Sequence, residues 1–234
     1  MSQIEITKKI KSFKKSIYVS GDKSLSIRWV LFASLADGVS KAQNLLMSED
    51  VFAAIKVLKK LGIKVNTKNN IFKIYGKGIN GFKYKKNIIL DAENSGTLGR
   101  LILGLLINTP YPIKLIGDKS LSKRDFKRIS DPLTKFGTTF KLHKNKSLPL
   151  TISGSKKLKP IYFEEKKGSA QCKSAVIFGG MRANGLTLIK AKKSRNHTEL
   201  LCKYLKLPLK VKKKKNYDLI EVKKVKKIKP LNYK

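Results

Sequence analysis

Three apolar segments, each shortly preceded by a serine, constrain the fold of this chain more than any other feature. Ser24, Ser95 and Ser169 come before WVLFASLA, LILGLLI and AVIFGGM, and the serines are 71 and 74 residues apart. These segments are apolar on nearly every side, so we expect them to form buried helices. Their regular spacing indicates an internal threefold repeat, with the three helices side by side.

A second series of helical segments alternates with the first. Its members have apolar residues at helical spacing on one face and lysines on the other, which is typical of helices at a protein surface. They begin at Ser48, Lys123 and Ser194. We expect them to stop at Gly62, Gly137 and Pro208, because glycine or proline commonly follows the last turn of a helix.

Short runs of Ile, Val, Leu and Phe between turn residues predict β-strands. The clearest runs are residues 71–76, 87–92, 111–118, 148–154 and 186–191. Strands and helices therefore alternate, which is the pattern of an α/β fold. We expect three units, at about residues 21–90, 91–160 and 161–234, in which sheets and outer helices surround three buried parallel helices.

A literal repeat is also present, with GDKSLSIR at Gly21–Arg28 and GDKSLSKR at Gly117–Arg124. Its offset of 96 residues does not match the spacing of the apolar segments. We therefore do not interpret it as the structural period.

The chain is strongly basic, with 53 Lys plus Arg against 15 Asp plus Glu and a formal net charge of +38. Such a charge attracts phosphates and first suggests a nucleic-acid partner. Only six of these cations are arginine, whose bidentate fork reads base edges, and the 47 lysines are spread along nearly the whole chain. The composition argues against specific nucleic-acid recognition. A non-catalytic protein that binds anions or nucleic acid stays as the alternative function.

Cysteine use and hydropathy predict a cytoplasmic protein. Cys172 and Cys202 lack a CxxC spacing and cannot form a disulfide framework, so we expect two reduced thiols that serve packing. The apolar stretches are far shorter than a bilayer span, and the first residues lack the apolar core of a secretion signal. No membrane partner is expected.

The starts of the three buried segments carry small polar residues and a nearby cation. They are Lys23-Ser24 with Arg28, Asn94-Ser95-Gly96-Thr97 with Arg100, and Ser169-Ala170-Gln171 with Lys173. A single start of this kind is typical of an ordinary helix N-cap. Three starts on one face instead predict an anion site, because free N–H groups and the positive end of the helix dipole attract anions.

The rare arginines favour the same interpretation. Four of the six lie at or near helix starts, where a planar fork suits phosphate or carboxylate. They are Arg28, Arg100, Arg124 and Arg195. Arg128 and Arg182 fit this pattern less well, and we expect structural roles for them.

Five motifs together resemble one family. GDKSLSIRWVLFASLADG, AENSGTLGRL, GDKSLSKR, GSAQCKSA and SRNHTELL, in this order and spacing, are similar to the N-terminal half of 5-enolpyruvylshikimate-3-phosphate synthases. The resemblance runs from about Gly21 to the end of the chain. It implies one lobe of the enolpyruvyl transferase fold, with three βαβαββ repeats around three buried parallel helices.

The resemblance also implies a reaction of the shikimate pathway, which leads to the aromatic amino acids. The enolpyruvyl group of phosphoenolpyruvate is transferred to the 5-hydroxyl of shikimate 3-phosphate through a tetrahedral intermediate, and phosphate is released. No metal and no organic cofactor is implied. The related UDP-N-acetylglucosamine enolpyruvyl transferases would need a reactive loop cysteine, and residues 110–125 contain none.

Site residues follow from the resemblance position by position. Those implied for shikimate 3-phosphate are Lys23, Ser24, Arg28, Ser169, Ala170, Gln171 and Arg195. Those implied for phosphoenolpyruvate are Lys23, Asn94, Gly96, Arg124 and Gln171. Lys23 would thus contact both substrates. One departure is Asp125, which stands where the family has proline and is a candidate ion-pair partner of Arg124.

The resemblance implies that the active site is incomplete in this chain. The family's acid/base groups belong to a second lobe, and residues 1–20 are expected to complete that absent lobe. We therefore expect the isolated chain to be inactive without a companion chain that carries the second lobe. The sequence leaves open a truncated gene product, one piece of a split enzyme or a relic that binds anions.

Overall fold

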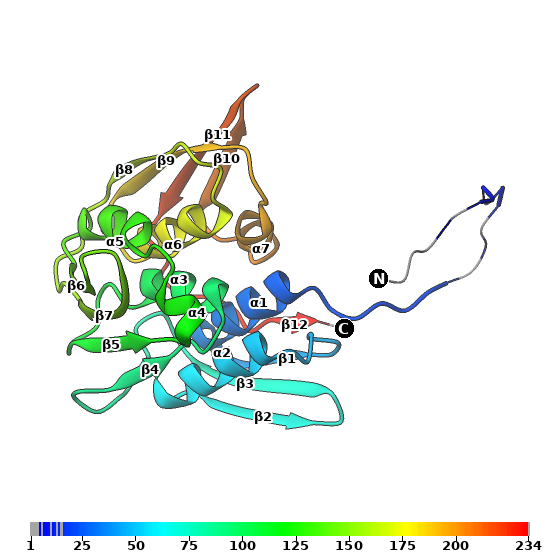
Figure 1. The fold of residues 1–234 in the computed structure, drawn as a ribbon, viewed down its shortest axis with the longest axis horizontal. Helices are drawn as coiled ribbons and strands as arrows, with labels where there is room; N and C mark the ends of the chain where they lie inside the picture. The colour runs from blue at the N-terminus through cyan, green and yellow to red at the C-terminus, as the bar shows by residue number, and fades with distance from the viewer. Residues whose placement is uncertain (1–4, 6, 10, 13, 15, 234) are drawn as a thin grey trace.

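Three four-stranded sheets surround three helices (Figure 1). The computed structural model describes residues 5, 7–9, 11, 12, 14 and 16–233. The expected terminal segment, residues 1–20, therefore lies partly outside the described residues. The central helices are α1 (Lys23–Leu35), α3 (Gly96–Leu105) and α6 (Ala170–Gly180), and nearly all their side chains are buried. The α/β class and the burial of the three apolar segments are confirmed.

The three sheets share one strand order. The first contains β12 (Asn232–Tyr233), β1 (Asp37–Ala42), β3 (Ile71–Lys77) and β2 (Lys64–Lys68). The second contains β4 (Ile89–Asp91), β5 (Ile113–Ile116), β7 (Ser147–Ser153) and β6 (Thr139–His143). The third contains β8 (Tyr162–Glu165), β9 (Leu186–Lys192), β11 (Tyr217–Lys223) and β10 (Leu209–Lys213). In each sheet the first two strands are parallel and the others antiparallel.

The first sheet takes its outer strand from the end of the chain. Lys41 N donates to Leu231 O at 2.8 Å, and Leu231 N donates to Ser40 Oγ at 3.0 Å. The division into three units stays a prediction. The strand β12 joins the first sheet although its residues lie at the end of the expected third unit. Because β12 comes from the far end of the chain, no sequence pattern near β1 predicts this pairing.

The caps of the central helices correct the predicted register. Ser95 and Ser169 cap α3 and α6, but α1 is capped by Asp22, whose Oδ1 accepts from Leu25 N at 2.7 Å. Ser24 lies inside the first turn of α1. From Asp22 to Ser95 is 73 residues and from Ser95 to Ser169 is 74, so the structural period is more regular than the serines suggested.

The literal repeat has a local cause. Asp118 caps α4 (Lys119–Ser122) and accepts from Leu121 N at 2.6 Å, as Asp22 does for α1. The same residues therefore start a helix twice, once in the core and once as a single turn at the surface. This confirms that the repeat does not mark the structural period.

The outer helices are α2 (Glu49–Lys60), α5 (Lys127–Thr134) and α7 (His197–Tyr204). The α2 helix begins after Ser48 as predicted, whereas α5 and α7 begin a few residues later than Lys123 and Ser194. Gly62 and Gly137 follow α2 and α5 with φ of +84° and +105°, which glycine adopts without strain. The run Lys212–Lys215 lies at the end of the edge strand β10 and in the turn to β11.

Close contacts between the central helices fix their starts relative to one another. The rings of Phe32 on α1 and Phe178 on α6 pack with centroids 5.0 Å apart. Gly104 on α3 lies so near α6 that an added Cβ would be 2.2 Å from Ala175 O. The helix starts are therefore held by a packed core rather than by flexible loops.

Candidate functional site

A polar cleft lies where the first turns of α1, α3 and α6 meet. Its volume is about 270 Å³. The lining residues are Lys23, Ser24, Asp50, Asn94, Gly96, Thr97, Arg124, Gln171 and Arg195. Three cations share the cleft with one carboxylate, at the positive ends of three helix dipoles. This combination attracts anions.

A second cleft of about 380 Å³ adjoins the first, because Gln171 and Arg195 line both. Its other lining residues are Arg100, Arg128, Lys167, Gly168, Ser169, Ala170 and Ser194. No acidic residue is among the described residues that line it. The two clefts together can hold two anionic groups side by side.

Gln171 links the two clefts. Arg100 Nη1 donates to Gln171 Oε1, and Gln171 Nε2 donates to Thr97 Oγ1 at 3.0 Å. Arg100 in turn lies over the Phe126 ring, with 5.8 Å between the guanidinium carbon and the ring centroid. These contacts bind the start of α6 to the first turns of α3 and fix the side-chain amide between the clefts.

Asp50 places a negative charge in the first cleft that the sequence did not predict. Lys23 Nζ lies 3.2 Å from Asp50 Oδ2 in a partly exposed ion pair. An exposed pair of this kind is weak, about 0–1 kcal/mol. Asp50 therefore orients the Lys23 ammonium without preventing it from binding an anion.

Asn94 is held by the cap of α4. Its Nδ2 donates to Asp118 Oδ2 at 2.5 Å, while Asp118 Oδ1 accepts from Leu121 N. The backbone hydrogen bond from Leu121 lowers the pKa of Asp118, so the carboxylate stays ionised. The second GDKSLS motif thus serves the cleft by fixing the Asn94 amide.

Arg124 lies directly against Gly96. An added Cβ at Gly96 would be 2.8 Å from Arg124 Nη1, so the absence of a side chain lets the guanidinium reach the first turn of α3. Asp125 Oδ1 accepts from the backbone N–H of Lys127, the first residue of α5, at 2.8 Å. Within the described residues, no ion pair joins Asp125 to Arg124. Asp125 therefore leaves the Arg124 guanidinium to the cleft.

Arg28 lies behind the clefts and lines neither of them. Only 3% of it is exposed, and it donates to Thr198 Oγ1 at 2.8 Å, Ser174 Oγ at 3.1 Å and Ser24 O at 3.0 Å. Burial lowers the pKa of Arg28 to about 10, so it is still charged at neutral pH. The Arg28 guanidinium thus joins α1, α6 and α7. Through its hydrogen bond to Ser24 O it holds Ser24 in place in this structure.

Lys173 is also absent from the clefts. It is fully buried and its Nζ lies 2.6 Å from Glu199 Oε1. Cys172 and Cys202 are buried free thiols, as predicted, and burial raises the pKa of Cys202. Burial, with a contribution from Arg28, lowers the pKa of His197 in the first turn of α7.

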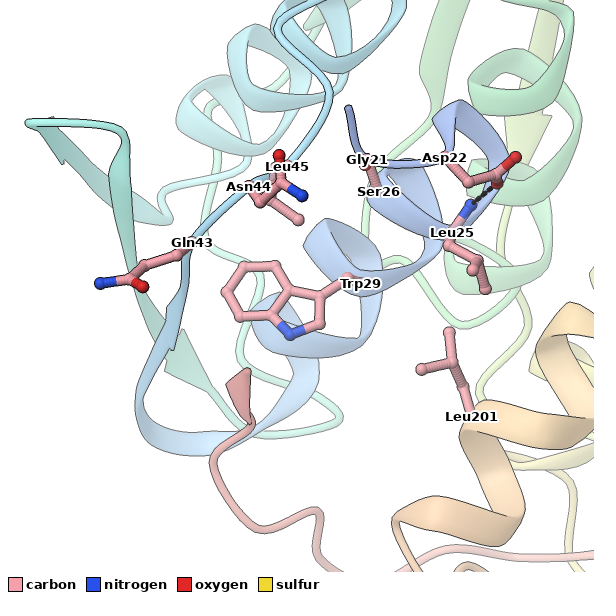
Figure 2. A pocket seen from close by; sticks show the side chains of 9 residues that line it. All are labelled: Gly21, Asp22, Leu25, Ser26, Trp29, Gln43, Asn44, Leu45 and Leu201. Atoms are coloured by element: carbon pink, nitrogen blue, oxygen red, sulfur yellow. Dashed lines mark hydrogen bonds between the residues drawn. The ribbon is translucent and has the colours of Figure 1, made fainter. Parts of the chain in front are cut away.

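A third cavity, of about 180 Å³, lies beside the start of α1 (Figure 2). Trp29, Leu25 and Leu201 give it apolar walls, and the hydrogen bond from Leu25 N to Asp22 lies at its rim. No cation is among its described lining residues. It is therefore unsuited to a phosphate ester.

Several lining residues were not predicted. They are Asp50, Arg128, Lys167, Gly168 and Ser194. Arg128, for which we expected a structural role, lines the second cleft, and its membership of the scarce arginine set was the available signal. Asp50 follows Glu49 in the first turn of α2, where acidic residues are ordinary, so no pattern distinguished it.

The described residues contain no feature typical of a metal site or of a membrane-spanning helix. No cluster of His, Cys, Asp and Glu suited to a metal ion occurs among the described residues. Within the same residues, no helix has the length and apolar character needed to cross a membrane.

Comparisons with known proteins agree on one family. The family model of EPSP synthase (3-phosphoshikimate 1-carboxyvinyltransferase) matches residues 7–234. The 3-phosphoshikimate 1-carboxyvinyltransferase of Streptococcus agalactiae is 42% identical over 190 residues, which cover 80% of this chain and 44% of that protein. The protein of the same name from Streptococcus suis is 40% identical over 198 residues, covering 84% of this chain and 46% of that protein.

Solved structures give the same result. The EPSP synthase from Acinetobacter baumannii superimposes with a TM-score of 0.85 and 31% sequence identity, covering 94% of this chain and 50% of that protein. The chain thus spans about half the length of the relatives it matches. With the family model covering nearly the whole chain, the protein belongs to the EPSP synthase (3-phosphoshikimate 1-carboxyvinyltransferase) family.

Proposed function

We propose that this chain is one lobe of a 3-phosphoshikimate 1-carboxyvinyltransferase of the shikimate pathway. Its substrates are shikimate 3-phosphate and phosphoenolpyruvate, and its location is the cytoplasm. The observation that carries the proposal is the pair of adjoining clefts at three helix starts, whose lining contains six different cations and one carboxylate. Two polyanionic substrates repel each other in water, and such a surface offsets that repulsion.

Each cleft suits one substrate. Shikimate 3-phosphate lies against Ser169, Ala170 and Arg195, where a helix start and a guanidinium fork bind its phosphate. Phosphoenolpyruvate lies against Lys23, Asn94, Gly96 and Arg124. Gln171, between the clefts, contacts both. Ser24 and Arg28 complete the shikimate side, with Arg28 acting through Ser24 and its neighbours.

These residues hold the 5-hydroxyl of shikimate 3-phosphate beside the central carbon of phosphoenolpyruvate. The hydroxyl loses its proton as its oxygen adds to that carbon, and the methylene carbon takes up a proton and becomes a methyl group. The tetrahedral intermediate then loses phosphate together with one proton of that methyl group, which restores the carbon–carbon double bond of the enolpyruvyl group. Proton transfer needs positioned acid/base groups, which the family resemblance assigns to a second lobe. Turnover therefore needs that second lobe in addition to the residues described above.

Binding of shikimate 3-phosphate tests the assignment of the clefts. Arg195→Gln should weaken binding by about 10- to 150-fold, the range for losing a hydrogen bond to a charged group. Lys227→Gln removes one exposed cation outside the clefts and is the matched control. Titration calorimetry at fixed ionic strength measures both. Equal losses in the two variants would indicate undirected electrostatic attraction and contradict the proposal.

Turnover tests the proposed reaction and its need for a second lobe. The isolated chain should release no phosphate from the two substrates, and a second-lobe polypeptide of this family should restore release that Lys23→Ala abolishes. Failure of every such complement, with binding intact, would favour an anion-binding relic. The alternative of a nucleic-acid-binding protein finds no support in the comparisons.

A further inference from the structure

A second group of polar residues lies at the opposite end of the central helices from the clefts. Two adjoining cavities, of about 150 Å³ and 30 Å³, are both lined by Asn80, Asn108 and Arg182. Asn108 follows α3 and Arg182 follows α6, each 13 residues after the serine that caps its helix. The larger cavity is therefore built at the C-terminal ends of helices whose N-terminal ends form the clefts.

All three units contribute to the larger cavity. The loop after β3 supplies Asn80, the loop after β7 supplies Lys156, and the loop after β11 supplies Lys224. Lys224 Nζ also donates to Asn184 Oδ1 at 2.6 Å, beside Arg182. Equivalent loops of the three sheets thus converge on one point and bring two cations, Lys156 and Lys224, close to Arg182.

Arg182 is the buried member of this group. It is 7% exposed, and its Nη1 donates to Asn108 Oδ1 at 2.7 Å and to Asn80 Oδ1 at 3.3 Å. Its Nη2 is buried and has no hydrogen-bond partner in the described part of the chain. Both partners of Nη1 are neutral amides, so the guanidinium keeps an uncompensated charge.

No carboxylate of the described residues offsets this charge. Within the described residues, Arg182 is in no ion pair and neither cavity is lined by Asp or Glu. Burial alone lowers the pKa of Arg182 to about 9, which still leaves it charged at neutral pH. An unpaired buried cation is costly, and native proteins normally supply a partner.

Two features of the fold stabilise Arg182 only in part. The guanidinium lies 6.0 Å from the centroid of the Phe82 ring, and the C-terminal end of α6 carries a partial negative charge. Neither gives Nη2 an acceptor. A buried polar atom without a partner, beside a cavity lined by amides and lysines, indicates that a ligand is the missing acceptor.

We infer that the cavity lined by Arg182, Asn108, Asn80, Lys156 and Lys224 binds a small oxyanion of the phosphate type. A tetrahedral oxyanion offers acceptors to Nη2 and to both ammonium groups at once, which a single water does not. The volume of about 150 Å³ admits an ion of a few heavy atoms. This site is separate from the proposed substrate clefts and does not depend on their function.

Inorganic phosphate is the probe, and the test must exclude binding at the clefts. The full chain therefore carries Arg124→Gln and Arg195→Gln as a common background, at constant ionic strength set with chloride. Side-chain amide resonances of Asn80 and Asn108 are followed by NMR during the titration. We expect a saturable shift of both amides. A shift that never saturates, or no shift, would overturn the inference.

Variants locate the site. In the same background, Arg182→Gln should abolish the saturable shift, or weaken phosphate binding at least tenfold. Because a buried substitution can prevent folding, Lys156→Gln with Lys224→Gln gives a second variant that changes only exposed side chains and should also weaken binding about tenfold or more. Lys226→Gln with Lys229→Gln is the control of equal charge. Equal weakening in the control, or unchanged binding in the rim variant, would overturn the inference.

Discussion

Lys173 Nζ lies 2.6 Å from Glu199 Oε1, and the two side chains are 0% and 6% exposed. The pair joins the second turn of α6 to the first turn of α7, beside the hydrogen bonds that Arg28 makes to Ser174 and Thr198. Ser174 and Thr198 also contact each other at 2.7 Å. This buried polar network lies directly behind the clefts. It fixes the position of the start of α7 and therefore of Arg195, which precedes α7.

Breaking the buried pair should destabilise the protein strongly. Lys173→Met leaves the Glu199 carboxylate buried without its partner, and we expect a loss of about 3–5 kcal/mol in the free energy of unfolding. The double variant Lys173→Met, Glu199→Gln removes both charges and should recover part of that loss. Urea unfolding measures these values. Lys127→Met breaks the exposed pair with Asp131 and should cost at most about 1 kcal/mol. A similar small cost for Lys173→Met would contradict the role of the pair.

The sequence predicts those parts of this structure that depend on local pattern. The segments that form α1, α3 and α6 are apolar all round, so burial alone identifies them, and the strands at Ile71–Lys77 and Leu186–Lys192 have the expected residues. Long-range pairing has no such signal. The strand β12 joins β1 across most of the chain, and only the fold brings these segments together.

The sequence likewise predicts one part of the candidate site and not another. Helix starts and scarce arginines identify Lys23, Gly96 and Arg195, because these residue types suit an anion wherever they lie. Arg28 and Lys173 have the same chemistry, yet tertiary packing buries them against Thr198 and Glu199. Charge and spacing therefore predict which residues can bind an anion, whereas burial decides which of them line a cleft.

His197 should make stability fall on acidification. Its pKa is lowered from 6.5 in the folded protein, mainly by burial and further by Arg28, so the unfolded chain takes up the proton first as the pH falls. The free energy of unfolding should therefore decrease as the pH falls below about 6.5. In His197→Gln this part of the pH dependence should disappear. Urea unfolding between pH 7.5 and 5 compares the two proteins, and an NMR titration of the ring checks the direction of the shift. Identical profiles would contradict this prediction.

Gly104→Ala should destabilise the core although alanine is the better helix former. The new Cβ would lie 2.2 Å from Ala175 O, which is backbone of α6 and cannot move independently of that helix. The cost of separating α3 from α6 exceeds the gain in helix propensity of about 1 kcal/mol. Thermal unfolding should show a lower midpoint. A raised midpoint would mean that the two helices do not approach as closely as this structure has them.

Gly96→Ala should leave the fold intact and weaken the phosphoenolpyruvate side of the proposed site. The added methyl meets only the end of the flexible Arg124 side chain closely, at 2.8 Å from Nη1, so the guanidinium can move away at little cost to stability. That movement takes the Arg124 guanidinium away from the first turn of α3, where phosphoenolpyruvate would lie.

Gly99→Ala is the matched control for this change. It adds the same methyl to the same helix, where the nearest atoms, in Ala92 and Phe126, are at ordinary contact distances of 3.4 Å. With the second lobe supplied and shikimate 3-phosphate saturating, the KM for phosphoenolpyruvate in a phosphate-release assay should rise for Gly96→Ala only. Shikimate 3-phosphate, assigned to Ser169 and Arg195, should bind both variants as it binds the unchanged protein. If Gly96→Ala binds phosphoenolpyruvate normally, Arg124 does not hold that substrate from its present position, and Gly96 serves only the start of α3.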